Sequence, residues 1–413
     1  MIEFNRFVLS NGLRVIVHED PSTPIAVMNV LYDVGARDED PSRTGFAHLF
    51  EHLMFGGSKH IPDFDEPLQR AGGENNAYTT NDLTNYYLQL PAENLETAFW
   101  LESDRMLSLA FSKESLEVQR KVVSEEFKEH YLNKPYGDAW MHLRELAYHA
   151  HPYRWLTIGK ELRHIEEANL DEVRAFFFAH YRPVNAILVV AGNVRTADVE
   201  RLAKKWFGPI EPGTPTLRRL PQEPTQQAAR VEKLNRKVPL DALYKAWHIP
   251  GRLDPRYYAV DLLTDILGGG ASSRLFQSLV KEKKIFSNID CYHYGSLDPG
   301  LLAIEGKLVK GVSMDQAEAA VDNELDRLIR EGLDSRELDK AKHKAESMMA
   351  FEDMGLANRA ASLAFYELLG DAGMMNSELE KYQAVDGASV MDEARSIFKP
   401  SNSNTLYYCA HAE

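Results

Sequence analysis

Residues 46–57 read FAHLFEHLMFGG, and the interpretation of the whole chain starts from this stretch. Its apolar residues recur at the spacing of an amphipathic helix, and the two closing glycines fit a helix C-terminus. His48, Glu51 and His52 nevertheless stand inside the same predicted helix. Residues three and four positions apart project from one helix face, so the three ionisable side chains converge on one side.

This convergence favours a metal site. Two imidazoles four residues apart can share one zinc ion, and a glutamate beside them can orient water and take its proton. The alternative is a surface helix with three solvated polar residues. The apolar flanks argue against it, and uncompensated burial of three ionisable groups would be costly. H-x-x-E-H is the inverted form of the H-E-x-x-H zinc motif, and such a short pattern needs a third ligand to support it.

The best segment for a third ligand is 115–130, SLEVQRKVVSEEFKEH. Val122, Val123 and Phe127 give this segment a helical apolar face, and Glu125 and Glu126 stand just beside that face. Helical spacing alone leaves both glutamates open as ligands. Acidic pairs on helices are usually exposed to solvent, so neither is distinguished without further context.

Composition limits the function classes. The chain has 413 residues, enough for two or three domains, and its 44% hydrophobic and 26% charged residues are typical of globular proteins. A net charge of −15 argues against a sequence-independent nucleic-acid binder. Cys291 and Cys409 lack CxxC spacing, so they give no sign of a disulfide framework or a thiolate zinc site.

Targeting signals are the next consideration. No apolar run reaches the length that spans a bilayer, so we expect no membrane partner. The first residues show no basic segment followed by an apolar one. We therefore expect a cytoplasmic protein, or a periplasmic one if an export signal has been removed.

A proline-rich stretch at 208–228 separates two halves with a similar order of predicted strands and helices. We predict a zinc-bearing domain at 1–212, a linker at 213–228 and a homologous domain without the zinc motif at 229–413. Each half combines strands with helices, which predicts the α+β class.

The two halves resemble a diverged internal repeat. AHLFEHLMFGG aligns with VDLLTDILGGG so that the apolar positions and the terminal glycines coincide. The polar positions then pair as His48 with Asp261, Glu51 with Thr264 and His52 with Asp265. Any two amphipathic helices that end in glycine would align about as well, and this remains the alternative.

Four stretches together carry a resemblance to a known family: GFAHLFEHLMFGGS, AGGENNAYTTNDLTNYY, RKVVSEE and HPYRWLTIG. They are similar to the motifs of the pitrilysin and mitochondrial processing peptidase family of inverted zinc peptidases, and the resemblance covers essentially the whole chain. It implies two homologous domains, each a mainly antiparallel sheet with helices packed on one face. It also implies a zinc-dependent metalloendopeptidase that cleaves unfolded or extended peptides.

The resemblance also implies residue roles. It assigns one Zn²⁺ per chain to His48, His52 and Glu126, with Glu51 as the general base. Glu125 is then the neighbour of the ligand. The family has a glutamate where this chain has Gln119, a position that supports the site without binding metal, so this difference bears on full activity rather than on zinc.

A second implied site is an edge strand that pairs with an extended peptide through backbone hydrogen bonds. The matching residues are Asn76, Ala77, Tyr78 and Thr79. Taken without the family, the same residues read as an ordinary hairpin strand.

The second half departs from the family pattern. Where the family often has an arginine and, seven residues later, a tyrosine, this chain has Lys281 and Asn288. Lysine lacks the bidentate fork of arginine, and asparagine is shorter than tyrosine. We therefore expect a homodimer, or a heterodimer with a related chain that carries the Arg/Tyr pair.

Two alternatives to an enzyme remain at this stage. One is a non-catalytic scaffold or core subunit of the same fold, and the other is a zinc-stabilised peptide-binding module without hydrolysis. Scaffold subunits typically lose zinc ligands. The presence of all three implied ligands and the base favours the enzyme.

Overall fold

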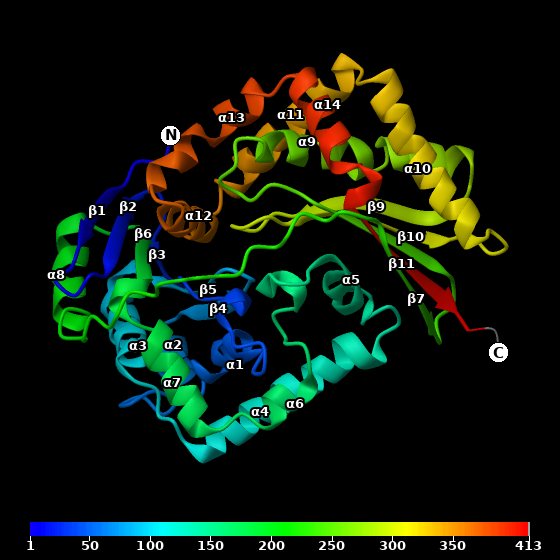
Figure 1. The fold of residues 1–413 in the computed structure, drawn as a ribbon. Helices are drawn as coiled ribbons and strands as arrows, with labels where there is room; N and C mark the ends of the chain where they lie inside the picture. The colour runs from blue at the N-terminus through cyan, green and yellow to red at the C-terminus, as the bar shows by residue number, and fades with distance from the viewer. Residues whose placement is uncertain (412–413) are drawn as a thin grey trace. The chain divides into compact units, whose positions relative to one another are not determined.

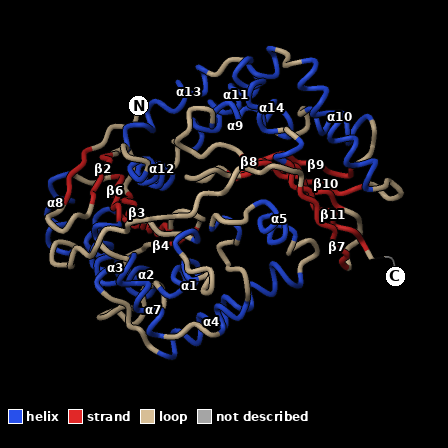
Figure 2. Tube along the Cα trace, in the orientation of Figure 1, coloured by secondary structure: helices blue, strands red, loops and turns tan. Residues whose placement is uncertain are grey.

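Two mixed β-sheets organise the chain in the computed structural model, which describes residues 1–411. Figure 1 labels the elements, and Figure 2 shows the strands of both sheets in red. Each sheet belongs to a different compact unit, and each unit is assembled from separate segments. Unit 1 comprises 1–128, 155–220 and 350–377, and unit 2 comprises 129–154, 221–349 and the segment that starts at Glu378.

The sheet of unit 1 has six strands in the order β1-β2-β6-β3-β5-β4. Neighbours are antiparallel except for β2 and β6, which are parallel. The strands are β1 (Asn5–Val8), β2 (Arg14–Glu19), β3 (Ile25–Tyr32), β4 (Glu74–Thr79), β5 (Thr84–Pro91) and β6 (Ala186–Gly192).

The sheet of unit 2 has five strands in the order β7-β11-β8-β10-β9, and only β7 and β11 are parallel. Its strands are β7 (Arg230–Arg236), β8 (Ala242–His248), β9 (Phe286–Tyr294), β10 (Leu301–Leu308) and β11 (Ser403–Ala410). This is the order of the first sheet without β1, with the parallel pair in the same place. The shared topology supports the internal repeat and confirms the predicted α+β class with two mainly antiparallel sheets.

The helices of unit 1 include the predicted zinc helix. They are α1 (Phe46–Leu53), α2 (Asp65–Arg70), α3 (Leu95–Leu107), α4 (Lys113–Phe127), α6 (Leu162–Glu166), α7 (Leu170–His180), α8 (Thr196–Trp206) and α12 (Leu356–Leu368). Helix α1 follows β3 and precedes β4. In unit 2, α9 (Tyr257–Gly268) follows β8 and precedes β9, so the two helices aligned from the sequence occupy equivalent places.

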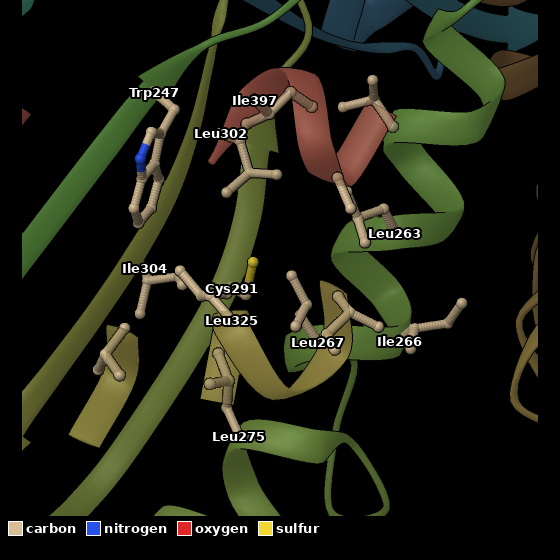
Figure 3. Packing of buried hydrophobic residues seen from close by; sticks show 14 of the residues in the cluster. Trp247, Leu263, Ile266, Leu267, Leu275, Cys291, Leu302, Ile304, Leu325 and Ile397 are labelled. Carbon is tan, nitrogen blue, oxygen red and sulfur yellow. The ribbon is translucent and has the colours of Figure 1, made fainter. Parts of the chain in front are cut away.

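The remaining helices of unit 2 are α5 (Ala139–Ala147), α10 (Met314–Glu331), α11 (Ser335–Glu352), α13 (Glu378–Ala384) and α14 (Gly387–Ile397). The last three residues of α11 belong to unit 1, because the unit 2 segment ends at Met349. Figure 3 shows part of the core to which these helices, except α5, contribute. Trp247 and Ile304 from the strands pack there with Leu263 and Leu267 of α9 and with Ile397 of α14. Burial of each such side chain contributes about 1.5–3 kcal/mol.

Helices pack on one face of each sheet, as expected, and a further helix covers the other face. Alternate residues of a strand point to opposite faces. In β8, Leu243 and Trp247 join the core shown in Figure 3, whereas Tyr244 and Ala246 pack with Leu143 of α5. In the same way, one face of the first sheet packs against α12.

The helices α5 and α12 also explain why the compact units differ from the predicted division into 1–212 and 229–413. Segment 129–154 comes from the first half of the chain but covers the second sheet, and segment 350–377 does the reverse. Each sheet has two apolar faces, and each exchanged segment supplies the helix that buries one of them.

The predicted linker is extended but fixed. Residues 211–227 form neither helix nor strand. Within them, the Arg218 guanidinium pairs with Asp33 and Asp38, each at 2.6 Å. Within residues 1–411, no helix combines the length and the apolar character needed to cross a membrane.

Candidate metal centre

Helix α1 is anchored by its apolar face. Leu49 and Phe50 are fully buried, and the Phe50 ring stacks on Tyr181 with ring centroids 5.2 Å apart. His48 and His52, on the other side of the helix, are only partly buried. The helical period thus separates a packing face from a polar face, as the sequence pattern predicts.

The polar face meets one carboxylate of α4. Oε2 of Glu126 lies 3.7 Å from Nε2 of His48 and 3.5 Å from Nε2 of His52. The two imidazole rings are nearly perpendicular, with centroids 4.9 Å apart. His48, His52 and Glu126 each offer one ligand atom, and these three atoms all lie within 4.8 Å of one another. Among the described residues, they are the group that could hold a metal ion.

These distances fit a zinc ion. Zn–N bonds of about 2.0–2.1 Å and Zn–O bonds of about 2.0–2.2 Å in tetrahedral geometry place two ligand atoms roughly 3.3–3.5 Å apart. The two observed separations from Glu126 are close to this value. Two imidazoles and one carboxylate also form a donor set of catalytic zinc sites, in which a fourth position stays open.

The electrostatics of the centre fit a cation as well. Burial lowers the pKa of His48 to about 4, although the nearby Glu126 acts in the opposite direction. The neutral imidazole is the form that binds metal. Burial also raises the pKa of Glu51, against the hydrogen bond that it accepts from Thr79. The site therefore disfavours isolated charges, and a bound cation would compensate the carboxylates.

Glu51 stands beside the three convergent residues rather than among them. The Thr79 hydroxyl donates a hydrogen bond of 2.6 Å to Oε2 of Glu51. Thr79 is the last residue of β4, so the hydroxyl ties the Glu51 carboxylate to the sheet edge. A carboxylate held next to a metal site can serve as a general base.

The structure separates the two adjacent glutamates that the sequence left open. Glu126 faces the histidine pair, whereas the Glu125 side chain is 73% exposed and pairs with Lys128 at 2.8 Å. Gln119 is partly buried on α4, two turns before Glu126. A π-helical segment, η3 (Lys128–Asn133), follows α4 immediately.

The four predicted substrate-binding residues lie on β4, which is the edge strand of its sheet. Exposure alternates along the strand, with Asn76 and Tyr78 exposed and Ala77 and Thr79 partly buried. Oδ1 of Asn76 accepts a hydrogen bond of 2.8 Å from the backbone N–H of Ala77. The strand contacts α1, so the edge adjoins the candidate metal centre.

The counterpart positions in unit 2 are occupied by internal pairs. Asp265 pairs with Lys344, and Asp261 accepts a hydrogen bond from the Tyr382 hydroxyl. Both acidic residues of α9 that align with His48 and His52 thus have a protein partner.

The two positions that depart from the family's Arg/Tyr pattern are both exposed. Lys281 lies in the π-helical segment η6 (Phe276–Glu282), with its ammonium 5.5 Å from the centre of the Phe276 ring. Asn288 lies on β9, the edge strand of the second sheet. Arg274, in the glycine-rich turn before η6, forms an ion pair with Glu337 and has a structural role.

Glu39 is a site residue that was not predicted from the sequence. Its carboxylate accepts hydrogen bonds from the backbone N–H groups of Gly45 and Ala47 at the start of α1. An acidic residue six positions before a glycine is too common a pattern to signal this role. Trp155, inside the HPYRWLTIG stretch, donates to the same carboxylate.

Two models of known protein families match this chain. A family model described as Insulinase (Peptidase family M16) matches residues 14–162, and one described as Peptidase M16 inactive domain matches residues 167–345. The zinc protease PqqE of Helicobacter pylori is 28% identical over 409 residues, which is 97% of this chain and 91% of that protein.

Solved structures show the same fold. The crystal structure of a protease from Helicobacter pylori superposes with a TM-score of 0.91 at 26% identity, covering 99% of this chain and 100% of that one. The periplasmic protease PqqL from Escherichia coli matches in fold, with a TM-score of 0.80 at 18% identity. That match covers 99% of this chain but only 48% of the PqqL chain.

Proposed function

Because the chain belongs to peptidase family M16, we propose that it is a zinc-dependent metalloendopeptidase that cleaves unfolded or extended peptides. The observation that carries the proposal is the convergence of His48, His52 and Glu126, with Glu51 beside them. Relatives that are named zinc proteases support the same class of reaction.

The match to an inactive domain does not oppose this proposal. That match covers residues 167–345, and all four site residues lie before it, within the 14–162 match. A scaffold subunit would be expected to have lost at least one of the metal-binding side chains. The intact set favours catalysis.

In the proposed mechanism, His48, His52 and Glu126 hold the metal. When bound, zinc supplies Lewis acidity that polarises a peptide carbonyl and makes water a better nucleophile at neutral pH. Glu51 orients the attacking water and takes its proton as the new C–O bond forms. The same carboxyl then gives the proton to the amine nitrogen as the C–N bond breaks. The Thr79 hydroxyl holds the Glu51 carboxylate in place for both transfers.

Substrate recognition is proposed to use the free edge of β4. Among residues 1–411, β4 pairs with β5 alone, which leaves its other side available to an extended peptide. Backbone pairing recognises extended chains and tolerates many side chains. A compact protein cannot supply an unpaired strand of this kind, so it should be a poor substrate.

An internally quenched extended peptide tests the proposal directly. We expect the purified chain to contain about one zinc per chain, to cleave the peptide, to lose activity with a chelator and to regain it with added Zn²⁺. A compact folded protein should be cleaved far more slowly than the same protein after unfolding. Mass spectrometry of the fragments measures both rates.

Two results would count against this function. A zinc-free chain that still cleaves the peptide would exclude the metal mechanism. Efficient digestion of the folded protein, with no cleavage of peptides derived from it, would exclude recognition of extended chains at the β4 edge.

We further propose that the active assembly contains two chains. Lys281 and Asn288 replace the Arg/Tyr pair that the family resemblance implies. The chain also matches only about half of PqqL, whose single chain is correspondingly longer. A second copy, or a related chain that carries the pair, would complete the site.

Activity and mass measured together decide this point. Loss of oxyanion donors typically costs ~10²–10³ in rate, so we expect the isolated chain to be slow and a related chain encoded beside it to raise kcat/KM by a similar factor. Light scattering should show a dimer. Full activity from a strict monomer would exclude a shared site. A fully active homodimer that Lys281→Ala leaves unchanged would remove the need for a different partner.

A further inference from the structure

The first turn of α1 has no cap of its own. Its N-cap residue is Gly45, which has no side chain to accept a hydrogen bond. Gly45 has φ of 89°, and a Cβ atom there would lie 2.6 Å from the carbonyl oxygen of Ile158. A serine, threonine or aspartate cap is therefore excluded at this position. The first N–H groups of the helix need an acceptor from elsewhere.

Glu39 supplies that acceptor. Its Oε2 accepts a hydrogen bond of 2.9 Å from the Gly45 N–H, and its Oε1 accepts one of 2.8 Å from the Ala47 N–H. The indole N–H of Trp155 donates to Oε2 at 3.0 Å. The carboxylate is buried, and burial raises the pKa of Glu39 to about 8 against these three donors.

The loop that carries Glu39 is fixed independently of α1. Arg218 pairs with Asp33 and Asp38, which both precede Glu39 in the loop between β3 and α1. The Trp155 indole also donates to the carbonyl of Ala36 at 3.0 Å. Glu39 is therefore a fixed point against which the start of α1 is placed.

The orientation of His48 depends on that placement. Ala47, which Glu39 holds, immediately precedes His48. Metal-binding histidines usually donate their second ring nitrogen to a partner that fixes the ring. Nδ1 of His48 is buried and has no hydrogen-bond partner among the described residues. The direction of Nε2 toward Glu126 is thus set by the α1 backbone and its packing.

We propose that Glu39 is a positioning residue of the metal centre, which holds the first turn of α1 so that Nε2 of His48 faces Glu126. This inference rests on the proposed function, because it takes His48 as a metal ligand. It also gives a role to the second half of the HPYRWLTIG stretch. Trp155 donates to Glu39, and the Ile158 carbonyl lies close to Gly45 at the start of α1.

Glu39→Gln is the sharpest test. The amide has nearly the shape of the carboxylate, but one of its two polar atoms is a donor. The test is made above pH 8, where the Glu39 carboxyl is ionised. Both of its oxygens then accept from N–H groups, so in the amide at least one donor must face another donor. We expect the affinity for Co²⁺, measured by competition with a chelator, to fall about tenfold or more. The visible absorption spectrum of bound Co²⁺, which reports ligand geometry, should change as well.

A matched control separates positioning from general destabilisation. Glu378 is also a buried carboxylate, but it pairs with Arg252 and Tyr258 in unit 2. Glu378→Gln should lower the unfolding temperature and leave the affinity and spectrum of Co²⁺ unchanged. Trp155→Phe, which removes one donor and keeps both backbone bonds of Glu39, should weaken Co²⁺ binding by a smaller factor than Glu39→Gln.

Each outcome decides the inference. Wild-type affinity and spectrum in Glu39→Gln would overturn it and leave the proposed function standing. Equal weakening in Glu378→Gln would reduce the effect to lost stability and overturn it too. If the unmutated chain bound no Co²⁺, both proposals would fail. If Glu39→Gln did not fold, unchanged Co²⁺ binding in Trp155→Phe would overturn the inference, and weaker binding would support it.

Discussion

Glu51→Gln should abolish most peptide hydrolysis while the chain keeps its zinc. The amide fills the same space and can still accept the hydrogen bond from Thr79, but it cannot take a proton from water. General bases contribute typically ~10²–10⁴ in rate, so kcat/KM for a quenched peptide should fall by a factor in this range. Metal analysis of the purified variant should still give about one zinc per chain.

The control for this prediction is Glu125→Gln, an identical substitution on an exposed side chain. It should leave both the zinc content and kcat/KM close to those of the unmutated chain. If Glu51→Gln emptied the site, Glu51 would be a ligand and its assignment as the base would be wrong. If the variant kept both zinc and activity, another group must take the proton.

The sequence predicted the part of the site that lies on one helix. His48, Glu51 and His52 share a face because helical geometry fixes their spacing, and the structure places them there. The third ligand, Glu126, could not be predicted in this way, because it lies on another helix. Local pattern left Glu125 and Glu126 equivalent, the family resemblance selected Glu126, and the packing of α1 against α4 brings Glu126 to the histidine pair.

Contacts between residues that are distant in sequence could not be predicted from local sequence patterns. Glu39 acts on α1 through backbone groups, and no residue pattern records a backbone contact. Arg218 stands in a proline-rich stretch that reads as a linker, yet its ion pairs fix that stretch to Asp33 and Asp38. Local sequence describes how a segment folds, but these contacts depend on which segments meet in the folded chain.

The placement of α5 in unit 2 and of α12 in unit 1 could not be predicted for the same reason. Both are amphipathic helices whose apolar faces fit a sheet, and the sequence does not specify which sheet. The two sheets share one strand order, apart from β1, because that order is set by connections within each half. The covering of the second face of each sheet instead required a helix from the other half of the chain.

Glu126→Gln should remove the metal from the chain, and Glu125→Gln should not. Glu126 supplies the carboxylate oxygen that faces both imidazoles, and a neutral amide is a much weaker zinc ligand. The loss of zinc affinity should exceed the ~10–100-fold that removal of an outer partner typically costs. Glu125 points to solvent and pairs with Lys128, so its substitution should change the zinc affinity less than about twofold.

Zinc affinity measured by chelator competition on the two variants compares neighbouring positions on one helix. Both substitutions remove one negative charge from the same turn of α4, so the long-range electrostatic effect on a cation is similar in the two. Any large difference between them therefore reports direct coordination. Loss of zinc in Glu125→Gln with retention in Glu126→Gln would shift the register of the third ligand by one residue. Retention in both variants would mean that a different side chain completes the site with His48 and His52.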